Sequence, residues 1–236
     1  MTPFIAELLG TALIVTIGDG IVANVVLPNT KGNNGGLVTI VLGWMIAVFI
    51  GVYVTSDISG GHLNPAVTIA LASAGKFPWD LVPAYILAQI LGAMLGAFLV
   101  WMVYKDHLNE CKDPSAQLAV FSTGPSIRNL PQNFITETLA TMVFLIGIFF
   151  IKPAATNLGA LSALPVALLV GGIGFGLGGP TGWAINPARD LGPRIMHFIL
   201  PMKGKGASDW GYAAVPVFGP IIGGILAAII YVQFLQ

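Results

Sequence analysis

Charged residues are scarce in this chain. Asp, Glu, Lys and Arg make up 8% of its 236 residues, whereas hydrophobic residues make up 56%. A soluble domain usually carries about 25% charged residues, because polar groups must cover its surface. This chain lacks the charge to cover a water-exposed surface, so we expect lipid to be its main solvent and the lipid bilayer its main partner.

Other absences exclude further classes of protein. The formal net charge is zero and no basic run is present, which argues against nucleic acid as a partner. The single cysteine, Cys111, can form no intramolecular disulfide and shows no metal-ligand spacing. We find no nucleophile–base set, and therefore expect no enzyme activity, no metal and no cofactor. The N-terminal apolar stretch lacks a basic leader region, which favours a first spanning helix over a cleaved signal.

Long hydrophobic runs, in contrast, are abundant. A bilayer core of about 30 Å requires about 20 apolar residues of helix. Two further apolar segments, roughly 63–75 and 185–200, are too short to span. The sequence therefore predicts an all-α membrane protein with six transmembrane helices and two re-entrant half-helices. The six predicted spans are roughly 4–27, 36–55, 81–104, 133–152, 158–179 and 210–235.

Both short segments begin with Asn-Pro-Ala, at residues 64–66 and 186–188. Asn is a favourable N-cap, and Pro suits the first helical position because its missing N–H would have no partner there. We therefore expect half-helices that begin at Asn64 and Asn186. The non-helical backbone before them is tolerated at membrane depth only where it is buried in protein or lines a wet cavity.

The two halves of the chain repeat each other. Residues 5–11 resemble 135–141, and residues 59–66 resemble 181–188. Each half has three predicted spans, and an odd number makes the second half enter the membrane from the opposite side. This is an inverted 3+3 repeat, whose short interrupted segments point to the transport site. We expect one transmembrane channel domain over 1–236, divided into repeat one at about 1–104, a connecting loop at about 105–132 and repeat two at about 133–236.

Glycine pairs spaced four apart occur in the third and sixth spans, at Gly92 and Gly96 and at Gly219 and Gly223. Such pairs let helix backbones approach closely. We interpret them as packing residues rather than hinges.

Two Asn-Pro-Ala boxes in an inverted repeat of six spans, the second continuing into Arg189 and Asp190, resemble the aquaporins and aquaglyceroporins. The resemblance covers nearly the whole chain. It implies half-helices that meet head to head at mid-membrane inside a six-helix barrel. It also implies a homotetramer in the cell membrane with one pore per subunit and cytoplasmic termini. Most Lys and Arg residues would then lie in outer loops, against the positive-inside rule. We keep the family orientation because half-helix polarity is tied to it.

The boxes carry groups suited to a pore. A helix N-terminus bears about half a positive charge, so two such ends facing one pore repel cations. The Asn64 and Asn186 amides offer N–H donors to a hydroxyl group, and the extended backbone before them offers carbonyl acceptors. Such features control aquaporin-type pores. The predicted motif residues are Asn64, Pro65, Ala66, Asn186, Pro187 and Ala188, and the predicted pore-lining backbone comprises Gly60, Gly61, His62, Leu63, Ala184 and Ile185.

The resemblance also implies a selectivity filter. Arg189 is a charge at membrane depth and should face water or a partner; the family places it in the filter, and an ion pair with Asp190 is the alternative. Spacing from the boxes adds Trp44, Gly174 and Trp183. Glycerol facilitators have Trp at the first position, strict water channels usually have His at the second, and glycerol facilitators commonly have Phe at the third, where this chain departs. The filter predicts a passive glycerol channel with water as co-permeant.

Three acids in the spans leave alternatives open. Glu7 and Glu137 are repeat mates that suggest either a proton relay or, by the resemblance, braces that accept hydrogen bonds from the loops before the half-helices. Asp19, which interrupts the first span, is either a solvated acid near the outer mouth or a polar contact near the tetramer axis. The rival functions are a strict water channel and a proton-coupled transporter. The sequence does not rank glycerol against dihydroxyacetone, urea, hydrogen peroxide or undissociated lactic acid.

Overall fold

A computed structural model describes residues 1–151 and 158–235, and six helices there are long and apolar enough to cross a membrane. Within these residues no β-strand occurs, so the chain has the predicted all-α class. The spanning helices are α1 (Pro3–Val26), α2 (Gly36–Ser59), α4 (Val82–Glu110), α6 (Leu130–Phe149), α7 (Leu164–Leu177) and α9 (Ala214–Ile230), with short 3-10 turns before α4 (Trp79–Leu81) and α7 (Gly159–Ala163) and a π turn after α9 (Tyr231–Leu235).

Some predicted boundaries differ from the structure. Helix α4 continues to Glu110, and the connecting segment 105–132 also contains α5 (Pro114–Phe121) and the start of α6. Helix α5 begins because Asp113 accepts a hydrogen bond from the Ser115 N–H at 2.8 Å, with Pro114 at the first helical position. This is the same cap chemistry that marks the half-helices. Lys152, the last residue of the predicted fourth span, lies outside the described residues.

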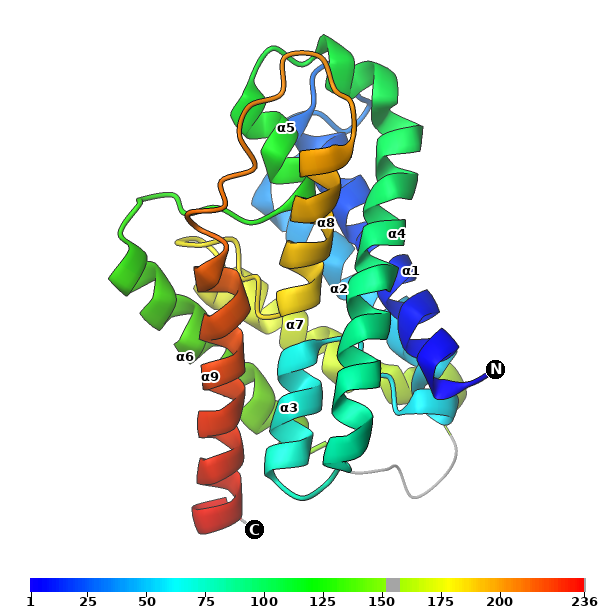
Figure 1. Cartoon of the computed structure of the whole chain (residues 1–236), viewed down its shortest axis with the longest axis vertical. Helices are drawn as coiled ribbons and strands as arrows, with labels where there is room; N and C mark the ends of the chain where they lie inside the picture. Colours follow the sequence, from blue (N-terminus) through cyan, green and yellow to red (C-terminus); the bar gives the residue numbers. More distant parts are fainter. Residues whose placement is uncertain (152–157, 236) are drawn as a thin grey trace.

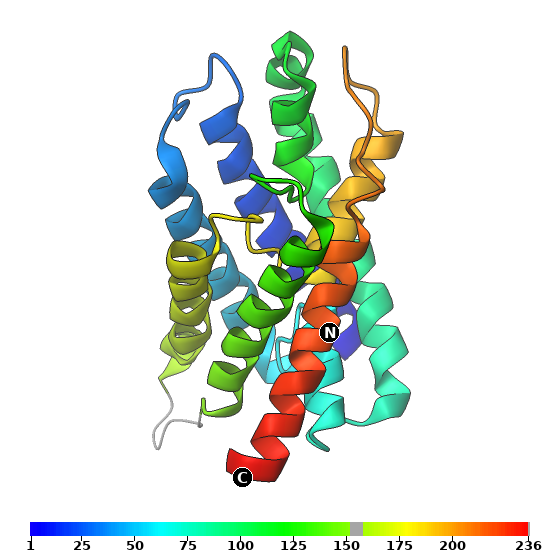
Figure 2. The same ribbon diagram turned by 90° about the vertical axis from the view of Figure 1, so that its left-hand side faces the viewer.

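The two half-helices are α3 (Pro65–Ser73) and α8 (Pro187–Ile199), and they lie end to end in the middle of the molecule, between α4 and α9 (Figure 1). Helix order is the same in both halves, with α1, α2, α3 and α4 matched by α6, α7, α8 and α9. Each half-helix packs on the last helix of the opposite half, α3 on α9 and α8 on α4. The inverted repeat therefore interlocks through the centre, and the spanning helices surround it (Figure 2).

The outer faces of the spanning helices are apolar. On α4, large exposed side chains recur every fourth residue, at Leu87, Leu91, Leu95 and Leu99. Residues four apart lie on one face of a helix, so these four form a continuous stripe. Such a stripe suits hydrocarbon rather than water, as expected for a multi-pass membrane protein.

Glycines allow the closest helix contacts. A Cβ atom at Gly92 would overlap the backbone carbonyl oxygen of Leu8 on α1, and one at Gly223 would overlap that of Thr138 on α6. Neither obstacle is a flexible side chain. The packing interpretation of the paired glycines is confirmed, and it explains why α1 fits against α4 in the way that α6 fits against α9.

The first prediction follows from this contact. Gly92→Ala should lower the thermal unfolding midpoint of the purified protein in detergent, because α1 and α4 must separate to admit the methyl group, at a cost of about 1–3 kcal/mol. Gly172→Ala is the matched control, since no atom of the described residues, other than its chain neighbours and its own helix backbone, lies within 4 Å of a Cβ at that position. Equal midpoints for the two variants would contradict the packing role.

Candidate functional site

The two half-helices begin at the predicted asparagines. The Asn64 side-chain oxygen accepts a hydrogen bond from the Ala66 N–H at 2.8 Å, and the Asn186 oxygen accepts from the N–H groups of Ala188 at 3.0 Å and Arg189 at 3.3 Å. Proline occupies the first helical position of each half-helix. Both N-termini point toward the centre of the molecule, so the positive ends of their dipoles face each other.

The amide nitrogens of the same two asparagines join the halves of the chain. Asn64 donates to the Ile185 carbonyl at 2.8 Å, and Asn186 donates to the Leu63 carbonyl at 2.9 Å. Each bond therefore runs from one repeat to the residue that precedes the asparagine of the other repeat. A primary amide has two N–H donors, so each asparagine keeps a second donor beyond this bond.

Glu7 satisfies the backbone before the first half-helix. Its Oε1 accepts from the His62 N–H at 3.0 Å and the Ser59 hydroxyl at 2.6 Å, and its Oε2 accepts from the Leu63 N–H and the Gln89 amide, both at 2.7 Å. The side chain is fully buried. All four of these hydrogen-bond partners act as donors, which suits an ionised carboxylate.

Glu137 has the same place in the second half. Its Oε1 accepts from the Ala184 N–H at 3.0 Å and the Thr181 hydroxyl at 2.6 Å, and its Oε2 accepts from the Ile185 N–H at 3.0 Å. Glu137 is also fully buried. Each carboxylate thus meets two backbone N–H groups of a re-entrant segment, in the arrangement that the brace hypothesis requires.

A cavity of about 150 Å³ runs past the meeting point of the half-helices. Many of the predicted pore residues line it, but Pro65, Ala66, Pro187 and Ala188 do not. Apolar side chains of α1, α2, α3, α6 and α7 form the rest of the wall. Those predicted residues that line the cavity are Trp44, Gly60, Gly61, His62, Leu63, Asn64, Trp183, Ala184, Ile185, Asn186 and Arg189.

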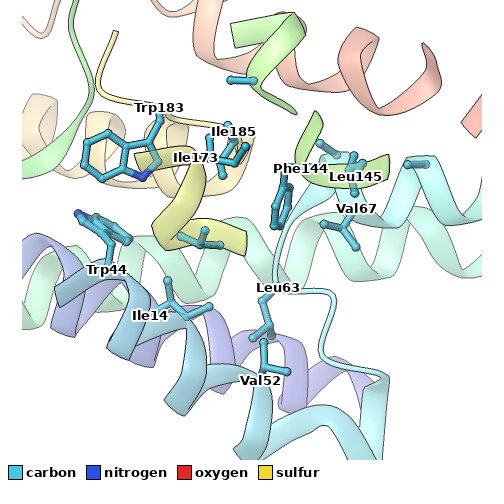
Figure 3. Packing of buried hydrophobic residues seen from close by; sticks show 14 of the residues in the cluster. Ile14, Trp44, Val52, Leu63, Val67, Phe144, Leu145, Ile173, Trp183 and Ile185 are labelled. Carbon is cyan, nitrogen blue, oxygen red and sulfur yellow. The ribbon is translucent and has the colours of Figure 1, made fainter. Parts of the chain in front are cut away.

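Arg189 and two indole rings form one part of this wall. The guanidinium lies over the Trp44 ring, with 4.1 Å between its central carbon and the ring centroid. Trp44 and Trp183 lie opposite one another at the edge of the buried apolar cluster (Figure 3). The structure therefore brings three of the four predicted filter residues together, as a cation beside two aromatic faces.

Gly174, the fourth predicted filter residue, does not line the cavity. A Cβ atom there would lie 3.1 Å from the Trp183 ring and 3.0 Å from Val41, and one at Gly178 would overlap the Trp183 ring. The Trp183 indole thus packs against the two glycines, whose missing side chains leave space for it. The prediction that Gly174 is itself part of the filter wall is therefore corrected: its missing side chain makes room for Trp183, which does line the cavity.

The re-entrant segments adopt unusual backbone conformations. Leu63 and Ile185, the residues before the two asparagines, have φ values of 52° and 41°, and Trp183 has a φ of 38°. Positive φ at residues other than glycine costs on the order of 1–3 kcal/mol and persists only where surroundings enforce it. Here the carboxylates fix the N–H groups of Leu63 and Ile185 and the asparagines fix their carbonyls.

Asp190 pairs with Arg194 rather than with Arg189. Its carboxylate lies 2.8 Å from Arg194 Nη2 and accepts from the N–H and hydroxyl of Thr123. Arg194 also donates to the Ser208 carbonyl at 2.8 Å. The alternative of an Arg189–Asp190 ion pair is therefore wrong, and the buried Asp190–Arg194 pair instead attaches two connecting segments to α8.

Outside the helices, a second ion pair holds the same region. Arg128 donates both terminal nitrogens to Asp209, at 2.8 and 2.9 Å. These hydrogen bonds lower the pKa of the Asp209 carboxyl below its ordinary value.

Asp19 is buried, with 1% of its side chain exposed, and Arg189 Nη2 lies 3.9 Å from its Oδ1. It is neither a solvated acid nor a contact on an outer face, so both alternatives from the sequence are wrong. An ionisable group inside a span needs a partner, and no local pattern indicates that a residue so distant along the chain supplies it.

Sequence reasoning also missed several supporting residues. Gln89 contacts Glu7, and the Tyr85 hydroxyl donates to the Ser59 carbonyl at 2.9 Å. The His62 ring lies against Tyr85 and Phe77 and is 3.1 Å from the Thr68 hydroxyl. Their positions depend on how helices pack, which periodicity does not specify. In the part of the chain that the structure describes, no three His, Cys, Asp or Glu residues cluster as metal ligands would.

Comparison with known proteins gives a consistent result. The sequence profile of the major intrinsic protein family matches residues 1–231. A probable glycerol uptake facilitator protein of Thermotoga maritima is 54% identical over 98% of each chain. The glycerol uptake facilitator protein of Streptococcus pneumoniae is 48% identical over 99% of this chain and 100% of its own. The X-ray structure of the aquaglyceroporin from Plasmodium falciparum matches with a TM-score of 0.87 and 32% identity, over 98% of this chain and 95% of that one.

The second prediction concerns the buried carboxylates. Glu7→Gln and Glu137→Gln each place an amide N–H₂ against N–H and O–H donors, and leaving a buried group unsatisfied costs about 1–3 kcal/mol. Both variants should unfold at lower temperature in detergent yet keep their solute flux once reconstituted. Glu110→Gln, at an exposed position, is the control. Full stability with abolished flux would show that the carboxylates act in transport and not as braces.

Proposed function

Since the chain belongs to the major intrinsic protein family, we propose that it is a passive channel for small neutral solutes, chiefly glycerol, with water as co-permeant. The observation that carries the proposal is the amphipathic wall formed by Arg189, Trp44 and Trp183. We treat residues 1–236 as one channel domain. We further propose a homotetramer in the plasma membrane with cytoplasmic termini, by likeness to the family.

The wall suits a polyol because a polyol has two chemically different sides. The C–H groups of glycerol can slide along the indole faces of Trp44 and Trp183, while its hydroxyls accept hydrogen bonds from the Arg189 guanidinium. A cation entering here would meet a fixed positive charge between largely apolar walls, where electrostatic repulsion is stronger than in bulk water. The same wall therefore favours a neutral solute over a cation.

The centre of the cavity continues this chemistry. A hydroxyl arriving there meets the remaining N–H donors of Asn64 and Asn186 and carbonyl oxygens of the two re-entrant segments. Because donors and acceptors line only part of an otherwise apolar wall, the solute keeps its hydrogen bonds while its carbon chain contacts apolar side chains. The two half-helix dipoles add a second positive barrier at this point.

The structure bears on the two rival functions. Glu7 and Glu137 do not line the cavity, and every neighbour named for them donates a hydrogen bond, which supports bracing over a proton relay. The residues Trp44 and Gly174 argue against a strict water channel, because by the family resemblance glycerol facilitators have Trp at the first position and strict water channels usually have His at the second. Dihydroxyacetone, urea, hydrogen peroxide and undissociated lactic acid share the small neutral character of glycerol, and we include them as candidate solutes.

Stopped-flow light scattering on reconstituted liposomes tests the proposal. Vesicles with the protein should re-swell in glycerol much faster than empty vesicles, and should shrink faster in an impermeant osmolyte. An imposed pH step should change neither rate nor final distribution. Water flux without glycerol flux would establish a strict water channel, and glycerol accumulation against its gradient would establish a transporter.

The third prediction is that Arg189→Ala admits protons or small cations, because the substitution removes a fixed positive charge from the wall of the cavity. Proton flux into liposomes under an imposed voltage measures this. Arg128→Ala removes a half-exposed arginine outside the cavity and is the control. Indistinguishable fluxes for wild type and Arg189→Ala would contradict the barrier role.

The fourth prediction is that Gly174→His sharply reduces glycerol permeability while water permeability falls much less. The imidazole would push the Trp183 ring into the cavity and narrow it. A three-carbon solute tolerates a narrower cavity less well than a single file of water molecules does. Gly174→Ala adds one methyl group in the same place and should have a smaller effect of the same kind. Equal loss of both permeabilities would indicate general blockage, and unchanged glycerol flux would refute the link between Gly174 and the constriction.

A further inference from the structure

Asp19 is a buried acid on α1. Both of its carboxylate oxygens are buried, and neither has a hydrogen-bond partner among residues 1–151 and 158–235. Arg189 is its ion-pair partner, at 3.9 Å between Nη2 and Oδ1. Ion pairing on this scale is weak in water but substantial where water is excluded. Within the described residues, Arg189 thus supplies the ion-pair contact of the Asp19 carboxyl group.

The Arg189 guanidinium also has a nitrogen that lacks a hydrogen-bond partner within the described residues. This nitrogen, Nη1, is buried. One face of the guanidinium lies on the Trp44 ring, and the residue borders the cavity, whereas Asp19 does not. Asp19 thus lies behind the wall, where it attracts Arg189 without contacting a solute in the cavity.

The other charges nearby are already paired. Asp190 is bound by Arg194 and Thr123, and Arg194 also donates to backbone carbonyls. Neither residue is free to replace Asp19 or Arg189 as a partner. The pairing of Asp19 with Arg189 follows from this arrangement.

Helix α1 supports the filter at the same turn through Gly18. A Cβ atom at Gly18 would overlap the six-membered ring of Trp44. Gly18 therefore packs against the Trp44 ring, and Asp19 faces the Arg189 guanidinium that lies over that ring. Gly18 and Asp19 interrupt an otherwise apolar span because they contact two filter side chains, those of Trp44 and Arg189.

We propose that Asp19 is the counter-ion and positioning residue of Arg189, holding the guanidinium against Trp44 and out of the solute path. The inference rests on the proposed function in that Arg189 borders the path. Removing the carboxylate frees the guanidinium to move toward the cavity, which narrows the passage. It also leaves the positive charge of Arg189 without compensation. Asp19 then determines both the bore and the net charge of the filter without lining it.

Asp19→Asn tests the proposal, because it removes the charge and preserves the size of the side chain. The glycerol-to-water permeability ratio in liposomes should fall roughly tenfold, the size expected when a coupled pair in contact is broken. Asp106→Asn makes the same change at an exposed position on α4 and should leave the ratio unaltered. A ratio unchanged by Asp19→Asn would overturn the proposal.

A double-mutant cycle separates positioning from a general structural role. In the Arg189→Ala background, Asp19→Asn should leave the ratio unchanged, because the group that it positions is gone. An equal effect in both backgrounds would show that Asp19 acts on the fold and not through Arg189. If Asp19→Asn does not yield a folded protein, Asp19→Ala runs the same cycle.

The cycle also distinguishes failure of the inference from failure of the proposed function. Wild-type glycerol flux tests the function alone. Water permeability across the four proteins of the cycle reports the coupling whether or not glycerol passes. If glycerol passes but the effects of the Asp19 and Arg189 substitutions are additive, only the proposed role of Asp19 is refuted. If the two substitutions are coupled in water permeability but glycerol does not pass, only the proposed solute is refuted.

Discussion

Backbone that leaves a helix at membrane depth must find its hydrogen-bond partners inside the protein, because hydrocarbon supplies none. In this chain the demand falls on the two segments before α3 and α8. Two buried carboxylates, Glu7 and Glu137, accept from the N–H groups of these segments, and two asparagines donate across the repeat to their carbonyls. The rest of the structure is arranged around this exchange of hydrogen bonds.

The consequences reach both the packing and the site. Fixing both polar groups of Leu63 and Ile185 holds these residues at positive φ, a conformation that regular helices and strands do not use. Backbone carbonyls and amide donors then coexist with apolar side chains along one cavity. Close packing by Gly92 and Gly223 keeps the spanning helices near enough for the carboxylates to reach the segments. Stability and the chemistry of the cavity therefore depend on the same residues.

Much of this could be predicted from the sequence, for identifiable reasons. Span number and half-helix positions follow from hydrophobic length and from Asn-Pro caps, which are local signals. The partners of charged residues are not local. Three features depend on how distant parts of the chain pack. Asp190 pairs with Arg194 rather than with Arg189. Asp19 is buried behind Arg189, and Gly174 makes room for the Trp183 ring. The helix α5 had a local Asp-Pro signal that could have been used.

The central claim is that solute passes where the two half-helices meet, and a structure determined from protein saturated with glycerol tests it most directly. Glycerol should occupy the cavity with hydroxyls within hydrogen-bond distance of the Asn64 and Asn186 amide nitrogens and of the Arg189 guanidinium. Its carbon chain should face Trp44 and Trp183. Glycerol bound along another route, with this cavity empty of solute, would contradict the account.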